Sequence, residues 1–390
     1  MRRARAKYHI ASDMCVLVMS WVLLLWSVLL GFFAGSYGIY FAYLKKSAGK
    51  PWRLKMDAAF EPALSILVPA HNEARVIGKK LENLADVAYP REKLEVFVID
   101  DASSDGTLAE IESFVRSHPD FPVRVVKQNI RGGKAAALNK VLGLVSHDII
   151  VVTDADAFWA KDALIKAVPY LYDPTVGAIS GRQVADSSVP SWVAKGEIGY
   201  LDLISVLRLG ESKVYSTLRF EGVLCAFKRA CFDEFDRSGA DDSGTALKAV
   251  QNGFRAILVP EVSVPSAVPS DFKERLRVKT RRSVHLTALW VQCLKSLLTG
   301  RRGLPKKIAV PEVLISLFDP FIFLILACVT VLLVVLSPIS LIPIVALIGC
   351  FVLIPVTRTY FVHGVLDQFV MVYSILLYIR RKRFTAWEKS

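Results

Sequence analysis

Two long apolar blocks enclose a water-compatible centre, and this arrangement constrains the chain more than any other feature. Residues 14–44 and 313–379 contain few charges, whereas residues 60–310 have the composition of a globular domain. Of the 390 residues, 53% are hydrophobic and 22% are charged, against about 25% charged in a typical soluble domain. A purely soluble protein is therefore excluded, and so is a mainly transmembrane transporter. The pattern predicts one soluble domain with membrane anchors at both ends.

The apolar blocks have the length of membrane-spanning helices. Residues 14–44 run well beyond the apolar core of a signal peptide, and about 20 apolar residues are enough to cross a bilayer. We therefore predict an N-terminal transmembrane anchor within residues 1–50. Residues 313–390 predict a C-terminal transmembrane region of two to three spans, at 313–336, 339–357 and 361–379.

The third of these C-terminal segments is ambiguous. It contains His363, Asp367 and Gln368, which are unusual in a lipid-facing helix. The segment either spans the membrane with its polar face inside the helix bundle, or lies in the interface as an amphipathic helix.

The net charge of +13 is concentrated beside the apolar blocks. Both chain ends are basic, and residues 271–307 hold eleven Lys and Arg residues against Asp271 and Glu274. A nucleic-acid-binding protein carries its basic patch on the folded domain, so nucleic acid is excluded as a partner. Anionic membrane lipids attract basic residues in this position instead. We predict basic amphipathic interfacial helices within residues 266–312, and expect the helix of 271–299 to lie along the membrane surface.

The six cysteines show no pairing pattern. They stand far apart in the sequence, without a Cys-x-x-Cys pair or a zinc-ligand spacing. We predict reduced thiols, which suit a domain on the cytoplasmic side of a membrane. The chain is therefore expected to be an integral protein of the cell membrane whose central domain faces the cytoplasm.

The central region alternates between short β-branched runs and segments of helical periodicity. This alternation predicts an α/β fold in which a mostly parallel sheet carries helices on both faces. The expected strands are Leu64–Val68, Leu94–Ile99, Val123–Val126, Ile149–Thr153 and Gly177–Ser180, and the expected helices are 74–86, 105–117, 131–145 and 160–171. Such sheets bind ligands beyond the carboxyl ends of their strands.

Polar clusters stand at four successive strand ends or helix starts: Pro69–Glu73, Asp100–Thr107, Gly132–Asn139 and Asp154–Asp156. Neither a dinucleotide-binding glycine motif nor a phosphate-binding P-loop is present. Each cluster alone could be a turn or a helix cap. Four together are hard to explain as caps, and they favour a ligand site.

The chemistry of these clusters fits a nucleotide diphosphate. An aspartate such as Asp101 can accept hydrogen bonds from a base or a ribose. Lys134 opens a helix after two glycines, where a phosphate is favoured. Asp154 and Asp156 can hold a divalent cation, since Mg²⁺ prefers one or two carboxylates together with phosphate oxygens.

With these motifs in place, residues of roughly 60–300 resemble family 2 glycosyltransferases of the membrane-integrated branch that includes cellulose, hyaluronan and chitin synthases. The resemblance implies a GT-A nucleotide-sugar-binding fold, with the catalytic domain at 60–265. It implies that Asp101 faces the nucleobase and that Asp156, with Asp154 nearby, binds Mn²⁺ or Mg²⁺ on the donor pyrophosphate. The first strand end matches the family's donor-binding strand, through Pro69, Ala70, Asn72 and Glu73.

The resemblance continues on the acceptor side. Residues 220–229 are similar to the acceptor-side strand that begins at a glycine, here Gly222. Asp241 and Asp242 then match the family's Thr-Glu-Asp helix start, which puts Asp242 at the position of the catalytic base. The alternative is that both aspartates only cap the helix of 244–252.

One departure concerns processivity. Processive synthases carry Gln-x-x-Arg-Trp beyond this point, and the Trp stacks beneath the acceptor sugar. The matching residues here are Lys279, Arg282 and Ser283, so the arginine is kept and the stacking platform is missing. We therefore expect a non-processive enzyme in which Arg282 and Lys134 help to neutralise the leaving diphosphate.

The resemblance implies an inverting, metal-dependent hexosyltransferase. The donor is a nucleotide-diphosphate sugar, with GDP-mannose favoured over a UDP-sugar by family-level analogy. The acceptor is a lipid-linked glycan or a polyprenyl (dolichyl) phosphate-type lipid in the membrane. The alternatives are a processive polysaccharide synthase that uses a UDP-sugar, and below it a nucleotidyltransferase or a non-catalytic membrane binding protein.

Overall fold

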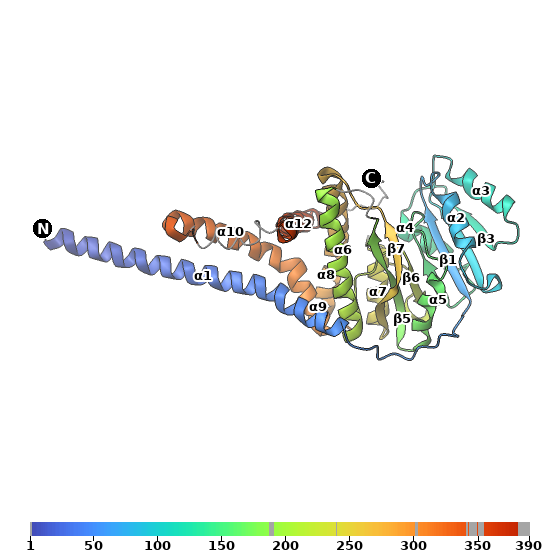
Figure 1. The fold of residues 1–390 in the computed structure, drawn as a ribbon, viewed down its shortest axis with the longest axis horizontal. Helices are drawn as coiled ribbons and strands as arrows, with labels where there is room; N and C mark the ends of the chain where they lie inside the picture. Colours follow the sequence, from blue (N-terminus) through green and yellow to red (C-terminus); the bar gives the residue numbers. More distant parts are fainter. Residues whose placement is uncertain are drawn as a thin grey trace.

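A computed structural model describes residues 2–186, 191–238, 240–300, 303–340, 342, 349 and 355–380. Within these residues, an α/β unit carries a group of apolar helices at one end (Figure 1). The strands form one sheet in the order β3-β2-β1-β4-β6-β5-β7. Their bounds are β1 Leu64–Ala70, β2 Leu94–Asp100, β3 Val123–Lys127, β4 Ile149–Val152, β5 Val176–Ala185, β6 Cys225–Lys228 and β7 Arg255–Ser266.

Helices cover both faces of the sheet and continue into the apolar extension. The helices of the α/β unit are α2 Ile77–Ala85, α3 Thr107–Ser117, α4 Lys134–Val141, α5 Ala163–Ala167 and α7 Asp241–Gln251. The helices between this unit and the extension, and within the extension, are α1 Arg2–Ala48, α6 Trp192–Val214, α8 Phe272–Leu298, α9 Lys306–Val313, α10 Asp319–Leu336 and α12 Pro355–Ile379.

The sheet is mostly parallel, as the sequence predicts. β3, β2, β1 and β4 run parallel to one another, and β5 runs parallel to β7. β6 is the exception, since it pairs antiparallel with both β4 and β5. The result is a mixed α/β sheet whose parallel half presents the predicted polar clusters along one edge.

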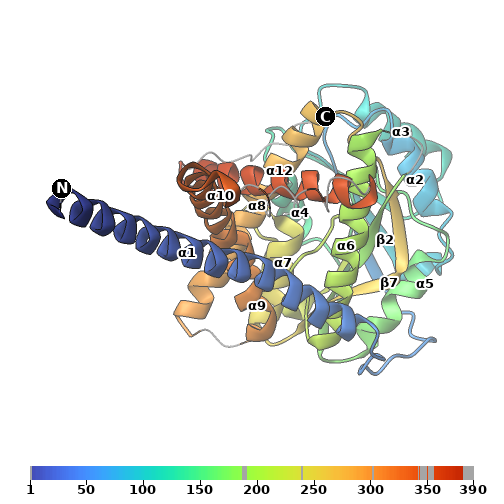
Figure 2. The ribbon, with the colours of Figure 1, turned by 60° about the vertical axis from the view of Figure 1, so that its left-hand side comes forward.

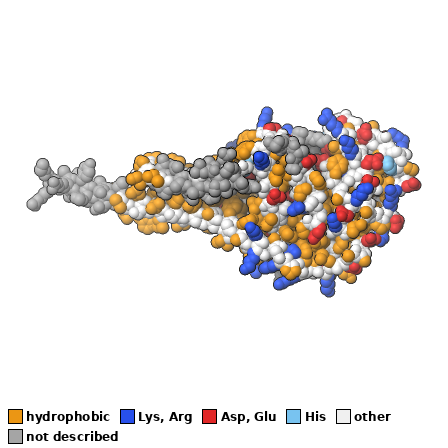
Figure 3. Space-filling model, in the orientation of Figure 1, with side chains coloured by type: hydrophobic (Ala, Val, Ile, Leu, Met, Phe, Trp, Pro, Cys, Tyr) orange, Lys and Arg blue, Asp and Glu red, His pale blue; other side chains and the backbone are white. Residues whose placement is uncertain are grey.

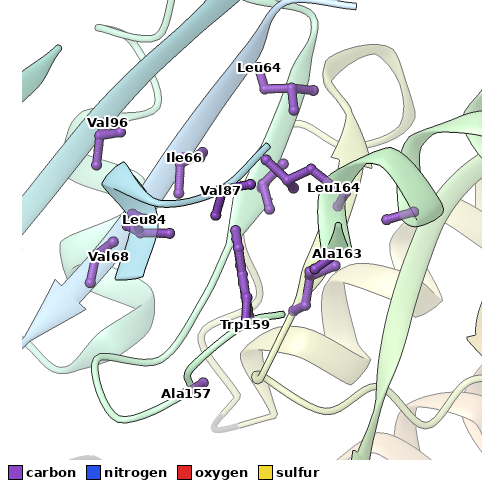
Figure 4. Packing of buried hydrophobic residues seen from close by; sticks show 14 of the residues in the cluster. Leu64, Ile66, Val68, Leu84, Val87, Val96, Ala157, Trp159, Ala163 and Leu164 are labelled. Atoms are coloured by element: carbon purple, nitrogen blue, oxygen red, sulfur yellow. The ribbon is translucent and has the colours of Figure 1, made fainter. Parts of the chain in front are cut away.

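The core lies on both faces of the central strands. β1 is buried along its whole length, because alternate side chains point to opposite faces and helices cover both. Leu64, Ile66 and Val68 pack on one face with Trp159, as Figure 4 shows, while Leu67 packs on the other face. This two-sided burial explains why the strand reads as a continuous apolar run.

The sequence pattern did not predict helix α6 or strand β7. α6 contacts α1 and α12 on one side and β5 and β7 on the other. Its buried residues therefore lie on several faces and include charged ones, so no single apolar stripe marks it. Figure 1 shows α6 between the apolar extension and the sheet, so this helix separates the two parts of the molecule.

Three helical segments are long and apolar enough to cross a membrane: Val16–Ala48, Lys306–Leu336 and Phe361–Ile379. They contain the predicted N-terminal anchor and the first and third predicted C-terminal spans. The predicted span 339–357 lies mostly outside the described residues. In the extension, Figure 3 shows apolar side chains with few charged ones, whereas charges of both signs cover the α/β unit.

Helix α8 differs from the expectation for residues 271–299. The sequence predicts a basic face along the membrane surface, but Arg275 is 1% exposed and Lys279 is 9% exposed. Arg275 pairs with Glu197 of α6 and with Asp367 of α12, and Lys279 pairs with the same two carboxylates. α12 lies across α8 and α6 (Figure 2). Two of the basic residues are thus neutralised between helices, so they do not face lipid headgroups.

Candidate active site

The predicted polar clusters meet at one edge of the sheet. Ala70 at the end of β1 pairs in register with Asp100 at the end of β2, and Leu67 of β1 pairs with Val152 at the end of β4. The segments that follow these three strands therefore leave the sheet side by side. This edge is where open α/β sheets bind their ligands.

The loops after β1 and β2 are locked together through their own polar atoms. The backbone N–H of Asn72 donates to Ser103 Oγ, and Asn72 Oδ1 accepts from the N–H of Ser104, both at 2.9 Å. Asn72 and Ala102 each have a φ of 55°, a conformation that costs a non-glycine residue about 1–3 kcal/mol. Strain of this size concentrates at functional sites, which makes this loop pair a candidate ligand platform.

The remaining residues of the first motif support this platform. Pro69 and Ala70 belong to β1 and are buried. Glu73 lies at the surface side of the loop, and its backbone N–H donates to Thr107 Oγ1 at 2.7 Å. The motif is therefore placed at the predicted edge, with its last residues nearest to solvent.

Asp101 has a role that the sequence did not indicate. Its carboxylate is fully buried and accepts the backbone N–H groups of Gly132 and Gly133, each at 2.7 Å. Gly133 has a φ of 83°, which a residue with a side chain rarely adopts. Asp101 thus fixes the loop that leads into α4. The nucleobase contact implied by the family resemblance is a different contact, and it stays a prediction.

Lys134, the first residue of α4, stands at the centre of an acidic cluster. Its Nζ lies 2.9 Å from Asp154 Oδ1, 3.1 Å from Asp241 Oδ2 and 3.3 Å from Asp242 Oδ1. These side chains come from three separate segments of the chain and are mostly buried. We name Lys134, Asp154, Asp241 and Asp242 the acidic cluster.

Gly222 closes the acidic cluster from the side of β6. A Cβ atom at this position would lie 2.7 Å from Lys134 Nζ, from Asp154 Oδ2 and from Asp242 Oδ2. The Gly222 carbonyl also accepts the backbone N–H of Asp154 at 3.1 Å. Only glycine lets the chain pass this close, so the position predicted for the acceptor-side strand lies directly against the predicted base.

The environment shifts the pKa values of the acidic cluster. Burial, together with the nearby charge of Asp241, raises the pKa of the Asp242 carboxyl well above its usual range. Burial alone would lower the pKa of the Lys134 ammonium, but the carboxylates of Asp154, Asp241 and Asp242 raise it well above its ordinary value. The raised pKa makes the Asp242 carboxylate a better proton acceptor, while the charge of Lys134 acts in the opposite direction.

Asp241 and Asp242 do not act as helix caps. They are the first two residues of α7, the N-cap is Ala240, and no side chain caps this helix. Their carboxylates point to Lys134 instead. The alternative of simple capping is therefore not what the geometry supports.

The loop after β4 has the donor groups that a divalent cation needs. Asp154 is 33% exposed at its side chain, and Asp156 is exposed. Carboxylate oxygens are hard ligands that suit Mg²⁺ and Mn²⁺. Among the described residues, no group of three or more His, Cys, Asp or Glu side chains could hold a metal ion. The two carboxylates of this loop suit a divalent cation that is held together with phosphate oxygens.

Comparison with known proteins shows the family to which the chain belongs. The family model described as glycosyltransferase like family 2 matches residues 62–284, more than half of the chain. The chain belongs to glycosyltransferase family 2.

Curated relatives of this family 2 glycosyltransferase match parts of it. The beta-monoglucosyldiacylglycerol synthase of Synechocystis is 39% identical over 34% of the chain, and the match spans 28% of that relative. The probable glycosyltransferase YdaM of Bacillus subtilis is 26% identical over 67% of the chain and 62% of its own length. The chain thus spans less than a third of the first of these and under two thirds of the second.

A solved structure matches nearly the whole chain. A mannosyltransferase from Pyrobaculum calidifontis, in complex with GDP-Man and Mn²⁺, is 31% identical with a TM-score of 0.80. The match covers 93% of this chain and 100% of the other. The GT-A fold expected for this glycosyltransferase is therefore confirmed.

Arg282 is a predicted site residue that is not joined to the acidic cluster by any of the contacts described. It is exposed on α8, and the ion pairs of the cluster run only among Lys134 and its three carboxylates. A contact between Arg282 and the leaving diphosphate stays a prediction.

A buried lysine that the sequence pattern did not single out lies beneath the loop after β4. Lys80 of α2 is fully buried, donates to Thr153 Oγ1 at 3.0 Å and to the Ala157 carbonyl, and lies 4.4 Å from the centre of the Trp159 ring. Burial lowers its pKa to about 7. A signal was present, because Lys80 falls on the apolar stripe formed by the other buried residues of α2: Ile77, Leu81 and Leu84.

Proposed function

We propose that this glycosyltransferase moves a mannosyl group from GDP-mannose to a lipid-linked acceptor, with inversion at the anomeric carbon. The observation that carries the proposal is the similarity, over 93% of the chain, to a mannosyltransferase bound to GDP-Man and Mn²⁺. That match includes apolar helices as well as the sheet. The acidic cluster and the loop of Asp154 and Asp156 support the same reading through their chemistry.

The reaction is a single displacement at the donor sugar. The acceptor oxygen attacks the anomeric carbon as the bond from that carbon to the diphosphate oxygen breaks. The acceptor proton passes to Asp242, whose raised pKa suits this role. One attack on the face opposite to the leaving group converts an α-linked donor into a β-linked product.

Two positively charged groups offset the charge of the leaving diphosphate. Asp156, with Asp154, would hold Mn²⁺ or Mg²⁺, which supplies Lewis-acid stabilisation to the phosphate oxygens when bound. The Lys134 ammonium lies between Asp154 and Asp242, so it offsets negative charge on both the donor side and the base side. Gly222 leaves the space in which acceptor and base approach each other.

The acceptor is assigned to the membrane because apolar helices join the α/β unit at one end. Three helices are long and apolar enough to cross a bilayer, and a relative is named for a glucosylated diacylglycerol product. We propose a lipid-linked glycan or a polyprenyl phosphate as the acceptor. We also place the α/β unit on the cytoplasmic side of the cell membrane, where its buried cysteines Cys225, Cys231 and Cys293 stay reduced.

A processive synthase is the main alternative, and the environment of Lys279 argues against it. Lys279 replaces the motif's glutamine and is buried in ion pairs with Glu197 and Asp367, with its Nζ 3.5 Å from the Tyr200 ring centre. Ser283, at the position of the stacking tryptophan, carries no aromatic ring. We therefore propose transfer of one or a few sugars per acceptor.

The test is donor selectivity followed by product analysis on the full chain in lipid nanodiscs. Calorimetry compares GDP-mannose, UDP-glucose and UDP-N-acetylglucosamine, each with Mn²⁺ and with EDTA. The proposal expects GDP-mannose to bind most tightly, and only with the cation. Mass spectrometry then expects a lipid product that carries one or a few hexoses, with a β-linkage by NMR. Tight binding of a UDP-sugar alone, an α-linked product or a long homopolymer would contradict the proposal.

A further inference from the structure

Within the loop that leads from α6 to β6, the four-residue segment Arg219–Gly222 touches the acidic cluster at its last residue. Gly222 lies against Lys134 and Asp242. Two positions earlier, the N–H of Phe220 donates to Ser243 Oγ at 3.0 Å, and Ser243 directly follows Asp242. The segment therefore fixes both the space in front of the proposed base and the start of the helix that carries it.

The first residue of this segment is tied to the beginning of a membrane helix. Arg219 donates through Nε and Nη2 to Glu312 Oε2, with the Nε distance at 3.1 Å. Glu312 is 2% exposed and lies in α9, at the start of the apolar helical segment Lys306–Leu336. The Arg219 guanidinium also lies 5.3 Å from the centre of the Trp290 ring of α8. A charge-assisted pair with a buried carboxylate and a guanidinium that is 18% exposed holds its geometry well.

A second buried carboxyl brings two more helices to the same point. Glu211 of α6 is 1% exposed, and it accepts hydrogen bonds from Tyr40 Oη of α1 at 3.0 Å and from Thr217 Oγ1 at 2.6 Å. Burial, together with the charge of Glu312, raises the pKa of Glu211 to about 8. The Arg219 guanidinium thus lies near two buried carboxyl groups, those of Glu211 and Glu312, where α1, α6 and α9 meet.

The backbone of the segment is held from the opposite side by Arg208 of α6, which is fully buried. Its Nε donates to the Arg219 carbonyl at 2.7 Å, and its Nη1 pairs with Glu221 Oε2 at 2.7 Å. Glu221 also accepts the N–H of Gln183 in β5 at 2.8 Å. The segment Arg219–Gly222 therefore has little freedom to move unless α6 or α9 moves with it.

We propose that Arg219 is a positioning residue that couples the start of the membrane helix α9–α10 to the acceptor side of the active site. Through its pair with Glu312 it holds the segment Arg219–Gly222, and through Gly222 it sets the distance between Asp242 and Lys134. The proposal rests on the proposed base role of Asp242. It predicts that the Arg219–Glu312 pair controls turnover without contacting the donor or the cation.

The experiment uses the full chain in nanodiscs and compares Arg219→Lys, Arg219→Gln and Glu312→Gln with the wild type. Each variant is expected to lower kcat about 10-fold, a difference of about 1.4 kcal/mol in the barrier. The Kd values for GDP-mannose and Mn²⁺ are expected to change less than about twofold. The double variant Arg219→Gln with Glu312→Gln should lose no more than either single one, because the pair acts as a unit.

Glu95→Gln is the matched control for loss of a buried carboxylate. Glu95 is 6% exposed and accepts from Ser65 and Ser146 at the start of β2, away from the carboxyl ends of the strands. It should lower the melting temperature and leave kcat unchanged. Arg219→Lys keeps the charge and the fold while losing the paired geometry, so a wild-type kcat in this variant would overturn the coupling, as would additive losses in the double variant.

Hydrogen exchange separates this inference from the proposed donor and acceptor. In the ligand-free protein, amides of residues 219–222 should exchange faster in Arg219→Lys than in the wild type, and amides of β2 should not. If the wild type transfers no mannose, the proposed function fails, and kcat is measured with the sugar that it does transfer. Unchanged exchange at 219–222 would overturn the coupling whatever the donor.

Discussion

At the scale of single residues, the acidic cluster is defined by an imbalance of charge. One ammonium group, on Lys134, faces the carboxylates of Asp154, Asp241 and Asp242. The cluster is therefore negative unless a carboxyl is protonated, and this is why the pKa of Asp242 rises through burial and the charge of Asp241. Such a cluster would repel a diphosphate that arrived without a cation. A divalent ion beside Asp156 would offset this repulsion.

Gly222→Ala tests how closely the chain must approach the acidic cluster. The new Cβ would lie 2.7 Å from three side-chain atoms, so Lys134, Asp154 and Asp242 must move apart. We expect transfer to fall at least about 100-fold, on the scale of losing a positioned base, with the fold retained by circular dichroism. Gly143→Ala is the control, because nothing lies within 4 Å of a Cβ there. Transfer at the wild-type rate in Gly222→Ala would contradict the assignment of this position.

Asp156→Ala tests the metal-dependent part of donor binding. Without this carboxylate, the diphosphate meets too little positive charge, so we expect calorimetry to detect no Mn²⁺-dependent binding of GDP-mannose. Asp162→Ala is the matched control, since Asp162 pairs only with Lys166 on the surface of α5 in the described contacts. Unchanged affinity in Asp156→Ala would remove the metal role from this residue.

At the scale of elements, the strands were predictable and some of their neighbours were not. β1, β2 and β4 are apolar, β-branched runs buried on both faces, so their positions follow from composition. β3 stands at the end of the sheet and is only partly buried, but its valines still mark it as a strand. β6 has only four residues and runs antiparallel, and no local signal sets its direction. α6 is buried on several sides and carries charged residues inward, which erases its periodicity.

The same limit applies to side-chain partners within the site. The sequence predicts that Asp101, Lys134 and Asp242 belong to one site, because each follows a strand or opens a helix at the ligand edge. It does not predict which of them touch. Lys134 and Asp242 are 108 positions apart and pair directly. Asp101 turns inward to two backbone N–H groups, a contact that depends on how the loop before α4 folds back.

Asp101→Asn distinguishes support of this loop from contact with a nucleobase. An amide can accept only one of the two backbone hydrogen bonds, so we expect a loss of about 1–3 kcal/mol in stability. Amides of residues 132–134 should exchange faster, and affinity for GDP-mannose and for Mn²⁺-pyrophosphate should fall together. Asp100→Asn is the neighbouring control, with one hydrogen bond of 3.3 Å. Loss of nucleotide binding with pyrophosphate binding intact would favour the nucleobase contact instead.

At the scale of the whole molecule, buried ion pairs join the apolar helices to the elements around the α/β unit. Arg275 and Lys279 of α8 pair with Glu197 and Asp367, and Arg219 pairs with Glu312 of α9. From the sequence, Arg275 and Lys279 looked like part of a basic face towards lipid headgroups. Arg219 and the pairing roles of the three carboxylates were not distinguished at all. Ion pairs between distant segments have no periodic signature, so only the folded chain reveals them.

The central claim is that Asp242 removes the acceptor proton while neighbouring residues hold the donor. Single-turnover transfer by Asp242→Asn, with donor and Mn²⁺ affinity measured on the same samples, tests it most directly. We predict that Asp242→Asn loses roughly 10²–10⁴-fold in transfer with donor affinity intact, and that Asp241→Asn loses much less. Equal losses in the two variants, or loss of donor binding in Asp242→Asn, would contradict the claim.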